Sequence, residues 1–329
     1  MKNPHVTVIV PVYNVSEYIE KCARSIFEQT LNNLEIIFVD DCSSDNSVKI
    51  IQETLKKYPV RIPLTRIIRM QSNGGLAAAR GQGIVEATGD FIIHCDGDDW
   101  VDTNLYESMY NKAIEVGADI VVCNYVEEFL NKQSLHEFNF ALKSPKELLK
   151  KWYSNTTHMS CCNKLIKKSI YYNNNILPWV GLNMWEDNGL MARIFYHSSR
   201  IENILGPVYH YNRTNTRAMT SGYGIKQVEQ MIDVATNLTK FFNEKKDAKD
   251  FKKTVMAFQF LARINLVTDS FANLRRYNNT FKGSEAIIPY LDKYAFSAKG
   301  RFRFYMVRYH LSWLFVLMFK VKNLWHRMI

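Results

Sequence analysis

Three carboxylates follow a short apolar stretch in the first third of the chain. Residues 91–95 are apolar apart from His94, and Asp96, Asp98 and Asp99 come directly after them. A carboxylate at the end of a buried strand is costly unless a cation meets it there. Mg²⁺ and Mn²⁺ prefer hard oxygen ligands, commonly one or two protein carboxylates together with substrate phosphates. Although an isolated Asp-x-Asp is more often a solvated turn, this one predicts a metal site, with Asp96 and Asp98 as its candidate ligands.

Two further acidic pairs could complete such a site. Asp40 and Asp41 end another apolar stretch. One of them can cap the next helix, and the other can accept a hydrogen bond from an imide N–H such as that of uracil. Glu186 and Asp187 lie at a predicted helix start, where acidic side chains are favourable in any case. A site with a metal and a leaving diphosphate still needs a general base, and Asp187 is the best candidate.

Other motifs are less specific. Lys164 follows Asn163 among apolar neighbours, and it lies either in a surface turn or near a phosphate whose charge it steadies. Gly81 and Gly83 resemble part of a dinucleotide-binding fingerprint, but they lie in a helical stretch and the third glycine is missing. No G-x-x-x-x-G-K-[ST] loop occurs. The glycine patterns therefore disfavour a Rossmann dehydrogenase and exclude a P-loop enzyme.

The elements that must position these residues alternate between strands and helices over residues 5–125. This alternation predicts a doubly wound, mostly parallel α/β sheet, whose ligands bind at the carboxyl ends of the strands. Asn14 is expected to cap the first helix, Ser44 or Asp45 the second, and Asp102 the fourth. The expected strands are residues 5–10, 34–39, 64–68, 91–95 and 119–123, and the expected helices are residues 15–26, 45–55, 76–87 and 102–116.

Beyond residue 124 the alternation fades. We expect a catalytic domain over residues 1–221, with a nucleotide-binding half at 1–124 and an acceptor half at 125–221, followed by a helical region at 222–329. In the acceptor half we expect a helix at 145–152, a short strand within 162–169, a helix from 185 and one or two strands in 200–211. In the C-terminal region we expect helices from about 223 and a charged, solvated corner at 244–253.

Charge is unevenly distributed along the 329 residues, whose formal net charge is +10. No acidic residue follows Asp292, and residues 299–329 mix lysine and arginine with aromatic side chains. Because the apolar run there is too short for a bilayer span, the tail predicts contact with an anionic membrane surface. The alternative is a terminal helix that packs on the protein. Nucleic acid is not an expected partner, because the basic residues lie far along the chain from the acidic cluster.

The six cysteines form no C-x-x-C pair and lie mostly in apolar stretches. That usage fits a reducing cytoplasm better than secretion. The N-terminal residues lead directly into a strand, so no signal peptide is expected.

The sequence contains VIVPVYN at residues 8–14, VDDCSSD at 39–45, NGGLAAAR at 73–80 and DGDD at 96–99. In their order and spacing these four segments resemble the family-2 glycosyltransferases with the GT-A fold. The later landmarks at residues 162–165, 185–187 and 211–213 resemble the bacterial surface-polysaccharide members. Two positions depart from the usual pattern, since Cys42 replaces a glycine and Gly81 replaces an asparagine.

The resemblance implies an inverting transfer of a sugar from a nucleotide-sugar, expected to be UDP-linked, to a glycan or lipid-linked acceptor at the cytoplasmic side of the membrane. Pro11, Tyr13 and Asp41 would line the nucleoside site, and Asp96 would contact the ribose or the donor sugar. The whole expected set is Pro11, Tyr13, Asn14, Asp41, Arg80, Asp96 and Lys164 for the donor, Asp98 with Asp96 for Mn²⁺ or Mg²⁺, and Asp187 with Glu186 for catalysis.

Two other classes of function remain to be weighed. A non-catalytic sugar-nucleotide-binding protein would tolerate loss of the base, so the presence of Glu186 and Asp187 counts against it. A sugar-phosphate nucleotidyltransferase would carry a glycine-rich, basic loop after the first strand, and residues 11–14 are not such a loop.

Overall fold

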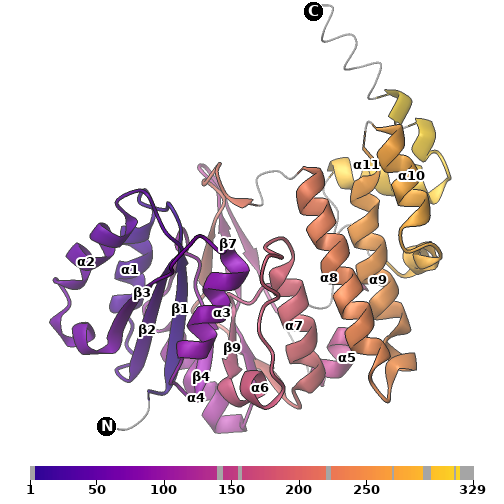
Figure 1. The fold of residues 1–329 in the computed structure, drawn as a ribbon. Coiled ribbons are helices and arrows are strands. Elements are labelled where there is room, and N and C mark those ends of the chain that lie inside the picture. Colours follow the sequence, from indigo (N-terminus) through magenta and orange to yellow (C-terminus); the bar gives the residue numbers. More distant parts are fainter. Residues whose placement is uncertain are drawn as a thin grey trace, which may run out of the picture. The chain divides into compact units, whose positions relative to one another are not determined.

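The computed structural model describes residues 4–138, 144–154, 158–219, 224–268, 270–291, 298–314 and 316–318 (Figure 1). The chain divides into two compact units, which are residues 1–146 with 159–221, and residues 147–158 with 222–329. The boundary expected after residue 221 also falls between these units. Segment 147–158, however, groups with the C-terminal helices and not with the acceptor half to which the sequence assigned it.

The first unit is built on a seven-stranded sheet of order β10-β6-β9-β4-β1-β2-β3. Strands β1 to β4 are parallel neighbours, and every residue of β1, β2 and β4 is buried. Their nearly continuous apolar sequences suit strands covered on both faces. The five predicted strands are confirmed, with small shifts at their ends. The seven are β1 (Val6–Val12), β2 (Leu34–Asp40), β3 (Thr65–Arg69), β4 (Phe91–His94), β6 (Ile120–Val122), β9 (Lys164–Lys167) and β10 (Ile201–Asn203).

Strand β9 runs antiparallel to its two neighbours. It lies between β4 and β6, with Ile166 opposite Ile92 and Lys164 opposite Val122. The sequence predicted a strand in this segment but not its place in the sheet. Because β9 is reversed, the turn before it, residues 160–163, lies near the carboxyl ends of β4 and β6. The mostly parallel α/β sheet is thus confirmed, with one reversed strand.

Helices connect the strands where the periodicity predicts them. Helix α1 buries one side, formed by Ile19, Cys22, Ala23 and Ile26, and α3 packs across β1 and β2 (Figure 1). Apolar residues that recur at helical spacing give each helix one apolar face, and this face packs against the sheet. The helices of this unit are α1 (Ile19–Phe27), α2 (Ser47–Leu55), α3 (Leu76–Glu86), α4 (Leu105–Val116), α6 (Lys168–Asn173) and α7 (Glu186–His197).

The prediction that Asn14 caps α1 is wrong. Helix α1 begins at Ile19, and the residue before it makes no side-chain cap. Asn14 instead adopts a left-handed backbone with φ 52°, and its Oδ1 accepts a hydrogen bond from the Ser44 backbone N–H at 2.8 Å. A contact between two loops therefore competes successfully with the local cap.

The prediction that Asp102 caps the fourth helix, α4, is also wrong. Asp45, one of two residues predicted to cap the second helix, α2, does accept a hydrogen bond from the start of that helix. Helix α4 begins at Leu105, and Asp102 Oδ2 accepts from the Val208 backbone N–H at 2.8 Å. Asp45 Oδ1 accepts from the Ser47 N–H, at the first residue of α2, at 2.9 Å. Only the second of these carboxylates satisfies a donor at its own helix start.

A smaller four-stranded sheet flanks the DGDD turn. Its order is β5-β11-β7-β8, with β11 parallel to β7 and antiparallel to β5. Residues 200–211 therefore do form two strands, as predicted, but in two different sheets. The strands are β5 (Trp100–Val101), β7 (Tyr125–Glu128), β8 (Gln133–His136) and β11 (Tyr209–Asn212).

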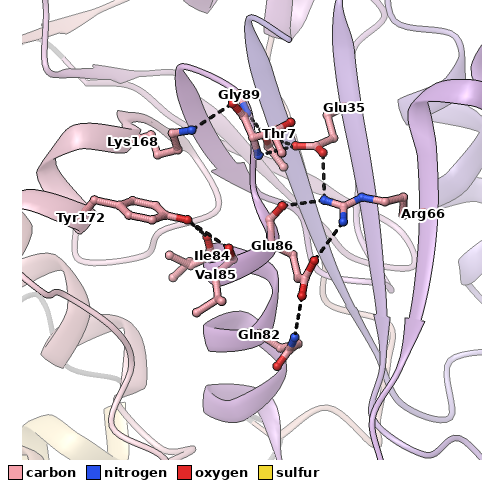
Figure 2. A network of polar contacts seen from close by, with 11 residues as sticks. Thr7, Glu35, Arg66, Gln82, Ile84, Val85, Glu86, Gly89, Lys168 and Tyr172 are labelled. Atoms are coloured by element: carbon pink, nitrogen blue, oxygen red, sulfur yellow. Dashed lines mark hydrogen bonds and ion pairs between the residues drawn. The ribbon is translucent and has the colours of Figure 1, made fainter. Parts of the chain in front are cut away.

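A polar network at the amino-terminal end of the sheet holds α3 in place (Figure 2). Glu35 is nearly buried and accepts hydrogen bonds from Thr7 Oγ1 at 2.5 Å and from the Thr88 N–H at 2.8 Å. Arg66 pairs with the other Glu35 oxygen at 2.9 Å. Burial alone would raise the pKa of Glu35, but the hydrogen bonds and Arg66 lower it. Glu35 is therefore ionised and fully engaged.

The same network reaches the end of α3. Arg66 also contacts the Glu86 side chain at 2.9 Å and the Glu86 carbonyl at 2.6 Å. The Tyr172 hydroxyl donates to the carbonyls of Ile84 and Val85, each at 3.1 Å (Figure 2). These donors satisfy carbonyls that a helix end leaves open. They fix the helix whose opposite end lies at the candidate site.

The second unit is helical. Its buried cluster joins residues of α8, α9 and α10 with Phe304, Met306 and Val307 of α11 and with Val316. The described part of the basic tail thus contributes to this core. The corner at 244–253 is a turn followed by a short 3₁₀ helix. The α-helices are α5 (Pro145–Lys150), α8 (Ile225–Asn243), α9 (Lys252–Arg263), α10 (Phe271–Asn279) and α11 (Ala298–Arg308), and the 3₁₀ helices include Ala248–Phe251. Among the helices of the described residues, none combines the length and apolarity of a membrane span.

Candidate active site

The carboxyl ends of β1, β2 and β4 meet at one edge of the large sheet. Val12 pairs with Asp40 across β1 and β2, and β4 runs parallel on the other side of β1. Gly97, in the DGDD turn, packs closely on the end of β1, since a Cβ there would lie 3.1 Å from the Pro11 carbonyl oxygen. The acidic turn is therefore held against the strand that carries the predicted nucleoside residues.

Asp99 stabilises the DGDD turn through hydrogen bonds to β11. It is buried, and it accepts hydrogen bonds from the Tyr209 hydroxyl and, at 2.8 Å, from the Asn212 backbone N–H. Burial and the neighbouring carboxylates of Asp98 and Asp96 raise its pKa. Asp99 therefore joins β11 to the turn and does not face a ligand.

Asp96 is paired with a buried cation. Its Oδ1 accepts from Arg80 Nη2 at 2.6 Å, and its Oδ2 accepts from the Cys162 thiol at 3.2 Å. Burial would raise the pKa of Asp96, but Arg80 and Cys162 hold it below its ordinary value. Asp96 is thus a carboxylate with both oxygens already engaged.

Arg80 joins the acidic turn to the second acidic pair. It lies on α3, is 2% exposed, and its Nη1 pairs with Glu186 Oε1. Burial would lower the pKa of Arg80, but the Asp96 and Glu186 carboxylates raise it, so the guanidinium stays charged. Its placement between two carboxylates makes Arg80 a positioning cation, and direct contact with a donor stays a prediction.

Asp187 is the more available member of its pair. Helix α7 begins at Glu186, and Trp185 before it has φ 67°. Asp187 Oδ1 accepts from the N–H and the side-chain amide of Asn188, whereas Oδ2 accepts nothing from the described residues. Burial raises the pKa of Asp187, although Arg80 opposes the shift. Such a carboxylate is suited to take a proton, whereas Glu186 is committed to the ion pair.

Asp98 is the carboxylate that fits a metal ion best. It is partly exposed, and its Oδ2 accepts from the Asn215 side-chain amide at 2.8 Å. Burial and the nearby Asp96 raise its pKa, and a divalent cation would offset both effects. Within the described residues no group of three or more His, Cys, Asp or Glu side chains forms a metal site. The donor set fits a cation held by one protein carboxylate with substrate phosphates, as Mg²⁺ commonly is.

The predicted nucleoside residues lie at the ends of β1 and β2. Pro11 is buried, and Tyr13 is 52% exposed, which leaves an aromatic face free to stack on a base. Asp41 is almost buried, and its two oxygens accept from the N–H groups of Gly74 and Gly75 at 2.7 and 2.8 Å. An ionised carboxylate can accept about four hydrogen bonds, so capacity for an imide remains.

Cys42 keeps the turn for which the family uses glycine. Its φ is 61°, in the left-handed region that suits glycine, and its thiol donates to the Met70 carbonyl at 3.1 Å. Cys42 therefore adopts a backbone conformation that glycine favours, and its thiol contact stabilises it there.

Lys164 lies inside the unit and not on its surface. It is 0% exposed, and its Nζ donates to the Ser160 carbonyl and to Asn163 Oδ1, both at 2.7 Å. Burial lowers its pKa to about 8. The surface-turn alternative is wrong. The ammonium holds the turn before β9, and contact with a donor phosphate, which stays a prediction, would require that turn to open.

Three polar side chains at the site were not predicted. Cys162 contacts Asp96, Tyr209 donates to Asp99, and Asn215 contacts Asp98. They come from segments that are far along the chain from the DGDD turn. No local spacing signals these contacts, because they depend on the reversed β9 and on β11.

Comparison with known proteins shows the family to which the chain belongs. Residues 7–173 match the pattern of glycosyl transferase family 2, and the chain belongs to that family. EpsH of Bacillus subtilis (strain 168) is 30% identical over 264 residues, covering 78% of this chain and 75% of EpsH. The protein is accordingly a glycosyltransferase.

Solved structures share the fold. A crystal structure of Staphylococcus aureus TarS 1-349 in complex with UDP-GlcNAc has a TM-score of 0.68 at 17% identity, covering 94% of this chain and 88% of that one. The mannosyltransferase PcManGT from Pyrobaculum calidifontis, in complex with GDP-Man and Mn²⁺, has a TM-score of 0.56 at 17% identity, covering 99% and 88%. The predicted GT-A fold is confirmed.

Proposed function

We propose that this glycosyltransferase moves a sugar from a UDP-linked donor to a glycan or lipid-linked acceptor in surface polysaccharide synthesis, with inversion at the anomeric carbon. The observation that carries the proposal is the pair of contacts from Arg80 to Asp96 and Glu186. They tie the turn that offers Asp98 to the helix start that offers Asp187. The candidate metal ligand Asp98 and the candidate base Asp187 are thereby held at the same edge of the sheet. The TarS complex with UDP-GlcNAc and the sequence landmarks at residues 162–165, 185–187 and 211–213 support the choice of donor and acceptor class.

The chemistry of the chain's own groups is a single displacement. Asp187 accepts the proton of the acceptor hydroxyl, whose oxygen attacks the anomeric carbon from the face opposite the diphosphate. The new glycosidic bond forms as the bond from the anomeric carbon to the diphosphate oxygen breaks, and the electron pair leaves with UDP. Glu186, held by Arg80, keeps the start of α7 in place for Asp187. Tyr13 and Asp41 hold the nucleoside.

Asp98 would hold Mn²⁺ or Mg²⁺, which when bound supplies charge stabilisation to the departing diphosphate. The Mn²⁺ in the PcManGT complex supports this choice of ion. Arg80 is unable to replace that charge, because both of its terminal nitrogens are engaged by carboxylates.

Calorimetry of UDP binding with Mn²⁺ tests the metal assignment. We expect Asp98→Asn to lose the Mn²⁺-dependent part of UDP affinity, since the amide carries no charge for the ion. Asp90→Asn is the matched control, because Asp90 is exposed at the opposite end of β4. UDP binding that is unchanged in Asp98→Asn, or unaffected by a chelator in the wild type, would contradict the assignment.

We further propose that the basic tail, residues 299–329, contacts the anionic inner face of the membrane as a peripheral anchor. In its described part, Phe304, Met306, Val307 and Val316 are buried, in keeping with the packed-helix alternative. Other apolar side chains are exposed, and they support membrane contact. They are Phe302, Tyr309, Leu311, Trp313, Leu317 and Met318.

Truncation is a poor test of this anchor, because it would remove core residues such as Phe304. The sharper variant is Trp313→Ser with Leu317→Ser, both on exposed positions. In a low-salt flotation assay with phosphatidylserine-containing vesicles we expect reduced binding, and Leu130→Ser, at an 85% exposed position, serves as control. Equal flotation of all three proteins would favour the packed helix.

A further inference from the structure

A residue from the loop before Asp187 caps helix α3. Asn183 Oδ1 accepts a hydrogen bond from the Ala77 backbone N–H at 3.0 Å, across 106 positions of sequence. The N-cap position of α3 is Gly75, which has no side chain for capping. The first N–H groups of a helix need acceptors, so Asn183 supplies what the local sequence does not.

The same helix start binds the predicted nucleoside carboxylate. Gly74 and Gly75 donate their N–H groups to Asp41. Gly75 has φ 82°, and a Cβ there would lie 2.2 Å from Asn183 Nδ2, so the backbone and the amide are in close contact. The start of α3 therefore contacts both Asp41 and Asn183.

The rest of the loop is fastened separately. Arg193 of α7 donates to the Leu177 carbonyl at 2.8 Å, and its guanidinium lies 4.1 Å from the centre of the Trp179 ring. These contacts fix residues 177–179 to α7. Asn183 ties the later part of the loop to α3, immediately before Trp185 with its left-handed backbone and before Asp187.

We propose that Asn183 is a positioning residue for sugar transfer. By joining the loop to the start of α3, it sets the place of Asp187 relative to the donor held beside Asp41. This rests on the proposed role of Asp187 as the base. A base must lie within hydrogen-bond reach of the proton that it removes, and a displacement of about 1 Å can reduce a rate by about 10²-fold.

The test compares Asn183→Ala with Asn183→Asp in the full chain. Alanine removes the acceptor for the Ala77 N–H, whereas aspartate keeps an acceptor and suits a helix N-terminus. We expect Asn183→Ala to lower kcat for hydrolysis of UDP-GlcNAc with Mn²⁺ by about tenfold or more. Its KM, and its UDP affinity in calorimetry, should stay within about threefold of the wild type. Asn183→Asp should restore most of kcat.

A measurement without substrate separates this inference from the proposed function. Amide hydrogen exchange should be faster at Ala77 and across residues 182–188 in Asn183→Ala, but normal in Asn183→Asp. Asn174→Ala is the control, because the Asn174 amide donates to the Ile170 carbonyl of α6 at 2.9 Å and, among the described residues, makes no bond to α3. Unchanged exchange and kcat in Asn183→Ala, or equal losses in the alanine and aspartate variants, would overturn the inference. Lack of hydrolysis by the wild type, with the exchange pattern as expected, would count against the proposed function only.

Discussion

Replacing Arg80 with methionine tests whether one buried cation holds the candidate site together. Arg80 is 2% exposed, and it contacts Asp96 at 2.6 Å and pairs with Glu186. Methionine replaces the aliphatic part of arginine but has no guanidinium, so Arg80→Met leaves two carboxylates without their cation. Breaking a buried ion pair by removing one partner costs about 3–5 kcal/mol, and we expect a loss of that size.

The loss should depend on pH. Arg80 now holds the pKa of Asp96 below its ordinary value, and without Arg80 burial would raise it. Burial already raises the pKa of Glu186 to about 8 although Arg80 opposes the shift, and without Arg80 that pKa would rise further above its value in the unfolded chain. A group whose pKa is raised by folding stabilises the protein only while it is protonated, and this stability is lost as the pH rises. The destabilisation by Arg80→Met should therefore be larger at about pH 8 than at about pH 6.

Hydrogen exchange of the β1 and β4 amides measures the opening of this unit alone. Arg24→Met is the matched control, since Arg24 lies 3.4 Å from Glu20 and the two side chains are 48% and 53% exposed. A solvent-exposed partner contributes little, so its loss should stay below about 1 kcal/mol. An Arg80→Met loss equal to that of the control, with no dependence on pH, would refute the reasoning.

Three other comparisons have definite expected outcomes. Gly83→Ala should destabilise the protein by about 1–3 kcal/mol in thermal denaturation, because its Cβ would lie 2.3 Å from Ile9 Cγ2. Gly81→Ala, in the same helix but with its nearest neighbour at 3.8 Å, should stabilise it by about 0.5–1 kcal/mol. Cys42→Val should be destabilising and Cys42→Gly tolerated in the same assay, since a β-branched residue suits φ 61° poorly. In the pH–rate profile, turnover should fall as acid protonates Asp187, and its raised pKa places that fall above the ordinary range of an aspartate. The reverse order of the two glycine variants, equal stability of the Cys42 variants, or a rate that rises on acidification would contradict the respective expectation.

The strands of the large sheet were predictable because their sequences need no distant information. Residues of β1 and β2 are mostly apolar and often β-branched, apart from Thr7, Glu35 and Asp40, which is the pattern of strands buried on both faces. Asp40 at the end of β2 and Asp96 after β4 could be placed at one edge from the parallel order alone.

The caps and β9 were not predictable to the same degree. Asn14 and Asp102 are common capping residues, yet each bonds to a segment elsewhere in the chain. Local propensity gives way where a long-range contact satisfies the same side chain. The direction of β9 depends likewise on pairing with β4 and β6, which a sequence of four residues does not encode.

The sequence named Asp187 as the candidate base, but the different surroundings of the two acidic residues required the structure. Glu186 is engaged by Arg80, whereas, among the described residues, one oxygen of Asp187 accepts only from Asn188. Lys164 is of a residue type that binds phosphate, but it is fully buried and donates to two acceptors of the protein. These contacts give it a structural role in the turn before β9.

The assignment of Asp187 as the base is the central claim, and one comparison of kcat tests it most directly. Asp187→Asn and wild type are assayed for UDP release from UDP-GlcNAc with Mn²⁺, after calorimetry has shown that both bind UDP equally. The account predicts that Asp187→Asn lowers kcat by about 10²–10⁴-fold, the usual contribution of a general base. A kcat close to that of the wild type, with UDP binding intact, would contradict it.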